Sequence, residues 1–118
     1  MNWQDNIITI RQNIQKLESE RLEKLEHLRL SEKTRAIALL KTYFLSFPDC
    51  KVWLFGSIIR PNSFSSVSDI DIAVKAYQGS RLDLYGDLEK LLLHKIDLVI
   101  LEKSNISEEI MQHGEQII

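Results

Sequence analysis

The hydrophobic and polar positions divide the chain into an N-terminal part with helical spacing and a later part in which strands and helices alternate. Residues 3 to 29 contain no glycine or proline. Their apolar positions recur on one helical face, at spacings of three and four, at Ile7, Ile10, Ile14 and Leu17. A second helical pattern begins at Ser31, a suitable N-cap, and continues to Pro48. Both segments are predicted helices, and the pattern leaves open whether they are continuous.

Three strands are predicted after Pro48. Residues 51–55 are rich in β-forming side chains, residues 69–74 alternate between polar and apolar with a period of two, and residues 95–101 are largely apolar. Helical spacing returns between residues 82 and 92 and again from 104 to 116. Strands that alternate with helices predict an α/β domain, with a small sheet against which the helices pack.

Composition narrows the class of protein. A chain of 118 residues suits one compact domain, which we divide into an N-terminal helical extension over 1–48 and a core over 49–118. No apolar run approaches the about 20 residues of a membrane span. The start lacks the features of a secretory signal and Cys50 is the lone cysteine, so a cytoplasmic location is expected. A net charge of -2 gives no general attraction for nucleic acid.

Two acidic residues, Asp69 and Asp71, lie two positions apart in the second predicted strand. Side chains alternate across a strand, so both carboxylates project from one face. Neighbouring carboxylates raise each other's pKa, and burial raises it further, unless a cation lies between them. Mg²⁺ suits this role because it binds one or two carboxylates together with phosphate oxygens and water. Taken alone, the same pattern also fits a strand end that points two acids at solvent.

The Gly56-Ser57 pair at the end of the first strand favours the metal-site interpretation. Glycine permits a close backbone approach, and a following helical turn would aim N-H groups and the Ser57 hydroxyl at an anion such as a polyphosphate. A second pair, Gly79-Ser80, follows no convincing strand and precedes no spaced acids. We interpret that second pair as an ordinary loop.

A third acid, Asp97, lies near the start of the last predicted strand. For Gly56 to lie beside Asp69, the first two strands must be antiparallel. For Asp97 to lie beside Asp69 and Asp71, the second and third strands must be parallel and joined by a crossover helix. The site hypothesis therefore predicts a mixed sheet.

The segments "GSIIR", "SDIDIAV" and "IDLVIL", with eleven residues between Ser57 and Asp69, closely resemble the polymerase β-like nucleotidyltransferases, specifically the minimal nucleotidyltransferase (MNT) domain. The matched stretch runs from about Val52 to Leu101. The resemblance implies the nucleotidyltransferase fold. It also implies transfer of a nucleoside monophosphate from an NTP, usually ATP, to an acceptor hydroxyl, with release of pyrophosphate.

The resemblance also assigns roles to residues. Gly56 and Ser57 match the turn that holds the outer phosphates, Arg60 matches a basic position that often follows it, and Ser68 precedes the acids as in many members. A local hydrogen bond from Ser68 is expected to hold the loop. Pro61 departs from the pattern because it stands where members often have glycine, which stiffens the turn beside Arg60.

The three acids match the metal-binding residues of the family. Asp69 and Asp71 correspond to the metal-binding pair, and Asp97 corresponds to the third carboxylate, which shares a metal and helps to activate the acceptor hydroxyl. The implied cofactors are two Mg²⁺ ions, with ATP as the substrate. Two ions would stabilise both the attacking and the leaving oxygen of an in-line displacement.

The resemblance implies a protein partner. Larger family members carry a C-terminal helical domain that binds the acceptor, and no such domain is expected in this chain. Stand-alone MNT proteins of this size are typically the antitoxin of a HEPN-domain ribonuclease toxin, and some add AMP to a toxin tyrosine. We therefore expect a HEPN toxin as the partner and no direct contact with nucleic acid or membrane.

Two alternatives remain open at this stage. The first is a non-catalytic module that occludes the toxin through the stripe from Ile7 to Leu17, although such stripes more often pack against their own domain. The second is transfer to a small molecule, for which dimerisation would have to complete an acceptor pocket. A zinc site is not expected, because no cysteine or histidine lies at metal-ligand spacing.

Overall fold

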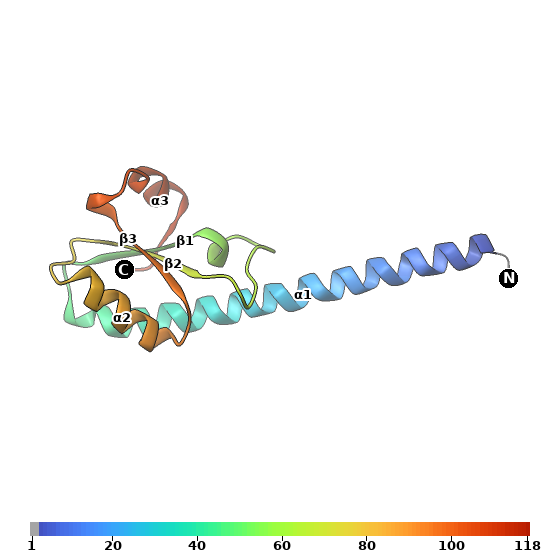
Figure 1. Cartoon of the computed structure of the whole chain (residues 1–118), viewed down its shortest axis with the longest axis horizontal. Helices are drawn as coiled ribbons and strands as arrows, with labels where there is room; N and C mark the ends of the chain where they lie inside the picture. The colour runs from blue at the N-terminus through green and yellow to red at the C-terminus, as the bar shows by residue number, and fades with distance from the viewer. Residues whose placement is uncertain (1–2) are drawn as a thin grey trace.

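The computed structural model describes residues 3–118, which form a four-stranded sheet with helices on both faces and one long helix that extends beyond it (Figure 1). The sheet order is β3-β2-β1-β4. The helices are α1 (Trp3–Tyr43), α2 (Arg81–Leu92) and α3 (Ser107–His113), and the strands are β1 (Lys51–Phe55), β2 (Ile70–Lys75), β3 (Ile96–Ile100) and β4 (Glu115–Gln116). Short 3₁₀ turns cover Phe44–Ser46, Gly56–Ile59 and Leu101–Lys103.

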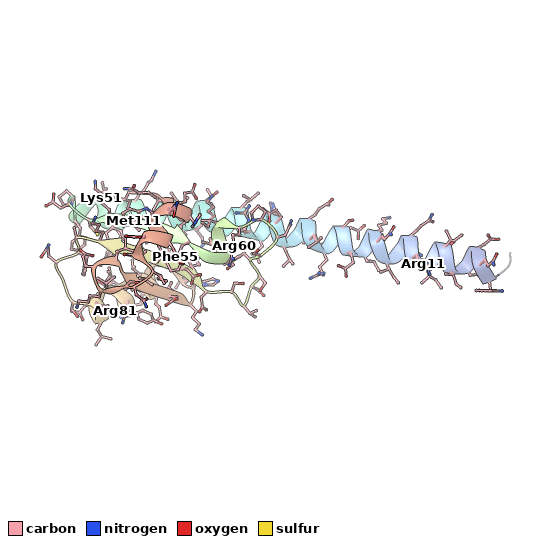
Figure 2. All side chains as sticks on the ribbon, turned by 90° about the horizontal axis from the view of Figure 1, so that it is seen from above. Arg11, Lys51, Phe55, Arg60, Arg81 and Met111 are labelled. Atoms are coloured by element: carbon pink, nitrogen blue, oxygen red, sulfur yellow. The ribbon has the colours of Figure 1, made fainter. Side chains whose placement is uncertain are left out.

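Helix α1 is one continuous helix of 41 residues. The predicted helix start at Ser31 is therefore wrong: Ser31 lies inside α1, where its side chain is exposed. A serine at an exposed position costs a helix little, and neither glycine nor proline interrupts the chain there. Every residue from 3 to 24 is exposed, so this half of α1, which we call the arm, projects from the sheet (Figures 1 and 2). The molecule accordingly measures 70 × 27 × 20 Å.

The sheet is mixed, as predicted. Strands β1 and β2 are antiparallel, whereas β2 and β3 are parallel and are joined by α2 as the crossover helix. Residues 51–55 form β1 with the predicted bounds. Strand β2 is shifted by one residue from the predicted 69–74, and β3 is one residue shorter at each end than the predicted 95–101.

The predicted C-terminal helix over 104–116 is wrong at both ends. Helix α3 covers only Ser107–His113, and the next residues form β4, which pairs with β1 and which the sequence did not predict. The chain turns at Gly114, whose N-H donates to the Ile110 carbonyl at 2.7 Å. A side chain at Gly114 would collide with that carbonyl and approach the Leu54 carbonyl, so the close packing of α3 on β1 requires glycine here.

Two apolar clusters hold the sheet. The larger lies between the sheet and the helices α1 and α2, and it contains Ile70 and Ile72 of β2. The smaller lies on the opposite face, where Ile110 of α3 packs against Trp53 and Ala73. Within the described residues, no helix is both long and apolar enough to cross a membrane.

Candidate active site

The candidate site is a row of side chains across three adjacent strands. Asp71 on β2 pairs in register with Phe55 on β1 and with Asp97 on β3. Because Ile70 and Ile72 point into the larger core, Asp71 projects from the opposite face, the one on which α3 lies. Neighbouring strands are about 4.8 Å apart, so the two carboxylates start from adjacent positions. Asp69, immediately before β2, lies two residues from Asp71 and on the same side.

Gly56 lies directly against this row. Its φ is +73°, and a Cβ atom built on it would lie 2.0 Å from Oδ2 of Asp71. The backbone at the end of β1 therefore touches the carboxylate, and no residue with a side chain fits there without displacing it. Ser57 follows in the 3₁₀ turn Gly56–Ile59, which is the helical turn predicted after the Gly-Ser pair.

The electrostatics of Asp71 reflect its neighbours. Burial raises the pKa of Asp71 to about 6, helped by the nearby charges of Asp97 and Asp69, while the Arg60 guanidinium lowers it. Lys95 pairs with Asp69 only loosely, at 3.9 Å and in solvent. The row is thus a cluster of negative charges that the nearby cations neutralise only in part.

The carboxylates fit a divalent cation that is shared with a substrate. Among the described residues, no three histidine, cysteine, aspartate or glutamate side chains form a group that could hold a metal ion without other ligands. Mg²⁺ does not require such a cage, because it takes one or two carboxylates and completes its shell with phosphate oxygens and water. Asp71 and Asp97 on adjacent strands, with Asp69 beside them, are the residues that would hold the ion, and its charge would offset the burial and the repulsion that raise the pKa of Asp71.

An ion pair on α1, between buried Arg29 and half-buried Glu26, fixes the Gly-Ser turn. Arg29, 6% exposed, is the one charged side chain that is buried in residues 3–118. It donates to the Ile58 carbonyl at 3.1 Å and, through Nε, to Oε1 of Glu26 at 2.8 Å. The other carboxylate oxygen of Glu26 accepts from the Asn62 N-H at 2.8 Å, so the pair fastens both the turn and the loop after it. The backbone and side-chain hydrogen bonds to Glu26 lower its pKa.

Arg60 and Ser68 border the site at the two ends of the loop. Arg60 ends the turn, where its N-H donates to the Ser57 carbonyl at 3.2 Å, and its side chain is exposed. The Ser68 hydroxyl accepts from the Ser65 N-H at 3.0 Å, which confirms the predicted local hydrogen bond. The structure thus brings the predicted site residues to one end of the sheet, with Ser68 holding the loop that leads to Asp69.

The other Gly-Ser pair serves a helix. The Ser80 side chain caps α2 by accepting from the Asp83 N-H at 3.4 Å. The pair at Gly79 therefore has a structural role, in keeping with its interpretation as a loop.

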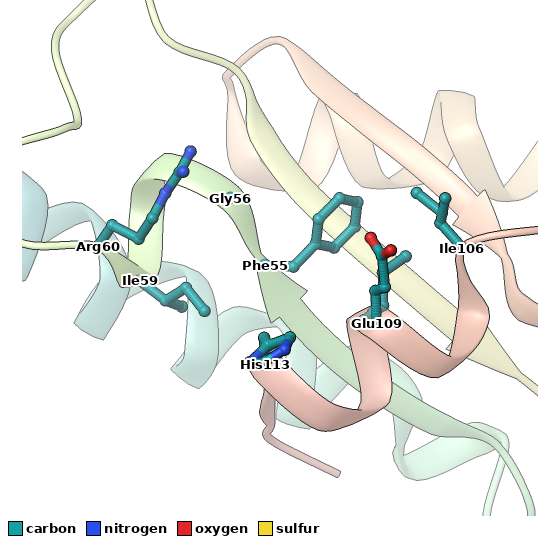
Figure 3. Close-up of a pocket in the computed structure, with 9 residues that line it drawn as sticks. Phe55, Gly56, Ile59, Arg60, Ile106, Glu109 and His113 are labelled. Atoms are coloured by element: carbon teal, nitrogen blue, oxygen red, sulfur yellow. The ribbon is translucent and has the colours of Figure 1, made fainter.

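A cavity of about 260 Å³ adjoins the row. It lies between the end of β1 with its turn and helix α3, and Phe55, Arg60, Ile106 and Glu109 are among its lining residues (Figure 3). The sequence does not predict this cavity, because it depends on how α3 packs against β1. The one signal available was the aromatic Phe55 immediately before the Gly-Ser pair.

The mixed four-stranded sheet with its three helices is a nucleotidyltransferase fold, and the acidic row lies on the face that carries α3. Comparison with protein families gives the same class, since the model described as "Polymerase beta, Nucleotidyltransferase" matches residues 37–118. The chain therefore belongs to the polymerase beta nucleotidyltransferase family. None of the curated proteins and none of the solved structures compared with the chain matches it.

Proposed function

We propose that the protein is a Mg²⁺-dependent nucleotidyltransferase that transfers AMP from ATP to a hydroxyl group of a partner protein. The observation that carries this proposal is the contact of Gly56 with Asp71 in the row that also contains Asp97. This contact joins the phosphate-binding turn to the carboxylates, so one triphosphate can touch both.

The transfer is a single displacement at phosphorus. The acceptor oxygen forms a bond to the α-phosphorus, the bond from that phosphorus to the bridging oxygen breaks, and pyrophosphate leaves with the electron pair. The hydroxyl proton passes to Asp97, which is exposed on β3 and open to a bulky acceptor. Asp69 and Asp71 orient the nucleotide, and Gly56 and Ser57 hold its outer phosphates. When bound, Mg²⁺ neutralises charge on the attacking and leaving oxygens.

The acceptor that best fits the MNT resemblance is a tyrosine of a HEPN-domain ribonuclease toxin, which would make this protein its antitoxin. Strand β3 is an edge strand, with β2 as its one neighbour in the sheet. Because Asp97 on that strand is exposed, the acceptor has to be presented from outside. A folded partner that offers a tyrosine on its surface meets this requirement.

The test is incubation with labelled ATP, Mg²⁺ and the proposed HEPN-domain partner. The wild type should label the partner, and the double variant Asp69→Asn plus Asp71→Asn should not. Asp49→Asn plus Asp83→Asn is the matched control, because both residues are exposed and the charge change is the same. Absence of transfer by the wild type, together with undiminished neutralisation by the double site variant, would exclude the enzymatic proposal.

A second candidate function is occlusion of the partner by the arm. The stripe from Ile7 to Leu17 was expected to pack against its own domain, but its side chains are between 37% and 64% exposed. An exposed apolar stripe at helical spacing suits docking to another helix. If the arm alone neutralises the partner, Ile10→Glu with Ile14→Glu should abolish neutralisation, and the active-site double variant should retain it.

A further inference from the structure

The cavity beside the acidic row has the size and lining of a site for one ring system. Its volume of about 260 Å³ lies just below the about 300 Å³ at which small-molecule pockets usually begin. Ile59, Ile106 and Ile110 supply apolar walls, and Phe55 contributes an aromatic ring (Figure 3). A flat, apolar ring fits these walls better than a charged group does.

The cavity is continuous with the phosphate end of the site. Gly56, which touches Asp71, and Arg60, whose charge lowers the pKa of Asp71, both line it. Phe55 is the register neighbour of Asp71 on the β1 side of the row, whereas exposed Asp97 lies on the β3 side. A nucleotide with its phosphates at the turn can therefore place its base in the cavity and leave the β3 edge free for the acceptor.

A polar group in the lining indicates which bases suit the cavity. Glu109 extends from α3 on the side of the Phe55 ring (Figure 3). No hydrogen bond or ion pair engages its carboxylate within residues 3–118. A carboxylate only accepts hydrogen bonds, so it favours a base that presents an amino group and disfavours one that presents a carbonyl oxygen.

We propose that this cavity binds the base of the nucleotide, and that it selects an amino-bearing purine by stacking on Phe55 and by a hydrogen bond to Glu109. The inference rests on the proposed function, because it assumes that the triphosphate lies at the Gly56–Ile59 turn. It assigns a role in substrate choice to α3, which contributes none of the three aspartates of the row.

The test compares equilibrium dissociation constants of three probes in the presence of Mg²⁺. These probes are α,β-methylene-ATP, its purine-riboside counterpart without the amino group, and inorganic tripolyphosphate. Stacking of one base should make the ATP analogue bind at least about tenfold more tightly than tripolyphosphate to the wild type. Phe55→Leu and Ile106→Ser should each reduce this ratio severalfold without changing tripolyphosphate binding. Ile106→Ser is the safer variant for folding, because residue 106 is the N-cap of α3, where serine is favoured.

Met111→Ser is the matched control for Ile106→Ser. Met111 lies on the same helix and is 40% exposed, against 41% for Ile106, but it does not line the cavity. The Met111→Ser variant should leave the ratio between the dissociation constants of tripolyphosphate and the ATP analogue unchanged. Glu109→Leu should bind the ATP analogue and its amine-free counterpart equally, whereas the wild type should prefer the ATP analogue.

Four outcomes would overturn the inference, and they separate its failure from that of the proposed function. The first two outcomes exclude the base site and leave the proposed nucleotidyl transfer intact. One is equal binding of the ATP analogue and tripolyphosphate by the wild type, and the other is an unchanged ratio in both Phe55→Leu and Ile106→Ser. An unchanged preference for the amino group in Glu109→Leu removes the selectivity by Glu109. Failure of every probe to bind the wild type removes the proposed function, and the inference with it.

Discussion

Gly56 is the residue at which the fold and the candidate chemistry constrain each other most tightly. Its backbone has a left-handed φ, and the Asp71 carboxylate occupies the space where a side chain would begin. The first requirement is conformational and the second is steric, and glycine alone meets both.

We expect Gly56→Ala to lower the free energy of unfolding by about 2 kcal/mol or more, because a left-handed alanine costs about 1–2 kcal/mol and the Asp71 side chain must also move. Nucleotide binding should be lost as well. The control is Gly86→Ala in α2, where a Cβ atom has no neighbour within 4 Å. That change should stabilise the helix by about 0.5–1 kcal/mol. Denaturant unfolding measures both, and equal stability of Gly56→Ala and the wild type would contradict the contact.

Asp71 should give the protein a characteristic dependence of stability on pH. Its pKa rises from an ordinary 3.8 to about 6 on folding, so between these values the folded protein binds the proton more readily than the unfolded chain. The stability due to this residue is therefore present below about pH 4 and is lost as the pH rises through about 6.

The measurement is denaturant unfolding between about pH 4 and 7 with a chelator present. Relative to Asp71→Asn, the wild type should lose on the order of 1 kcal/mol over this range, a value reduced because water screens a half-exposed carboxylate. Taking the difference from the variant cancels the carboxylates that do not interact with Asp71, such as Glu26, which titrates in the opposite sense. A difference that does not change with pH would show that Asp71 has an ordinary pKa.

At the scale of elements, local pattern predicted most of the sheet, and long-range packing decided the remainder. The β-forming side chains of 51–55 and the alternation in 69–74 predicted the two strands. The requirement that three acids lie together then correctly predicted the strand directions and the crossover helix. The sequence could not reveal β4, because two exposed residues have no pattern of their own and pair only where α3 delivers them to β1.

The ion pair of Glu26 and Arg29 shows the same limit. Glu18 and Arg21 on the same helix have identical residue types and identical spacing, but that second pair is exposed. The difference arises only because the turn at Ile58 packs against α1 beside Arg29, 29 residues away in sequence. A local sequence pattern cannot distinguish the two pairs.

This comparison gives a prediction. Arg29→Gln should lower the free energy of unfolding by about 1–3 kcal/mol, because it removes the charge that pairs with half-buried Glu26 and leaves the buried Ile58 carbonyl without its donor. Arg21→Gln, the matched control, should cost less than about 0.5 kcal/mol, since exposed pairs contribute little. Thermal or denaturant unfolding of the two variants measures the difference, and similar values would show that Arg29 is not the anchor of the turn.

At the scale of the whole molecule, the arm sets the shape. The radius of gyration is 19.2 Å, whereas a compact domain of this length has about 13 Å. The exposed residues from 3 to 24 account for the excess, because a helix of that length extends about 33 Å. The interactions that stabilise the fold are therefore made mostly outside the arm.

Deletion of residues 1–20 should leave the free energy of unfolding within about 0.5 kcal/mol of the wild type, since the described part of this segment buries no side chain. Small-angle scattering should show the radius of gyration falling towards about 13 Å. Nucleotide binding at the acidic row should persist. A large loss of stability would show that the arm packs on the domain in solution.

Because α1 is unbroken, it also fixes the direction in which the side chains of the arm face. The direction in which Ile7 to Leu17 face is set by the direction in which Arg29 is buried, with no hinge between them. One alanine inserted after Ser19 would turn the stripe by about 100° about the helix axis. Seven inserted alanines would restore the direction of the stripe to within about 20° and would move it outward by about 10 Å. The two insertions therefore separate the direction in which the stripe faces from its distance to the sheet. Any partner that docks on the stripe must be sensitive to at least one of these two changes.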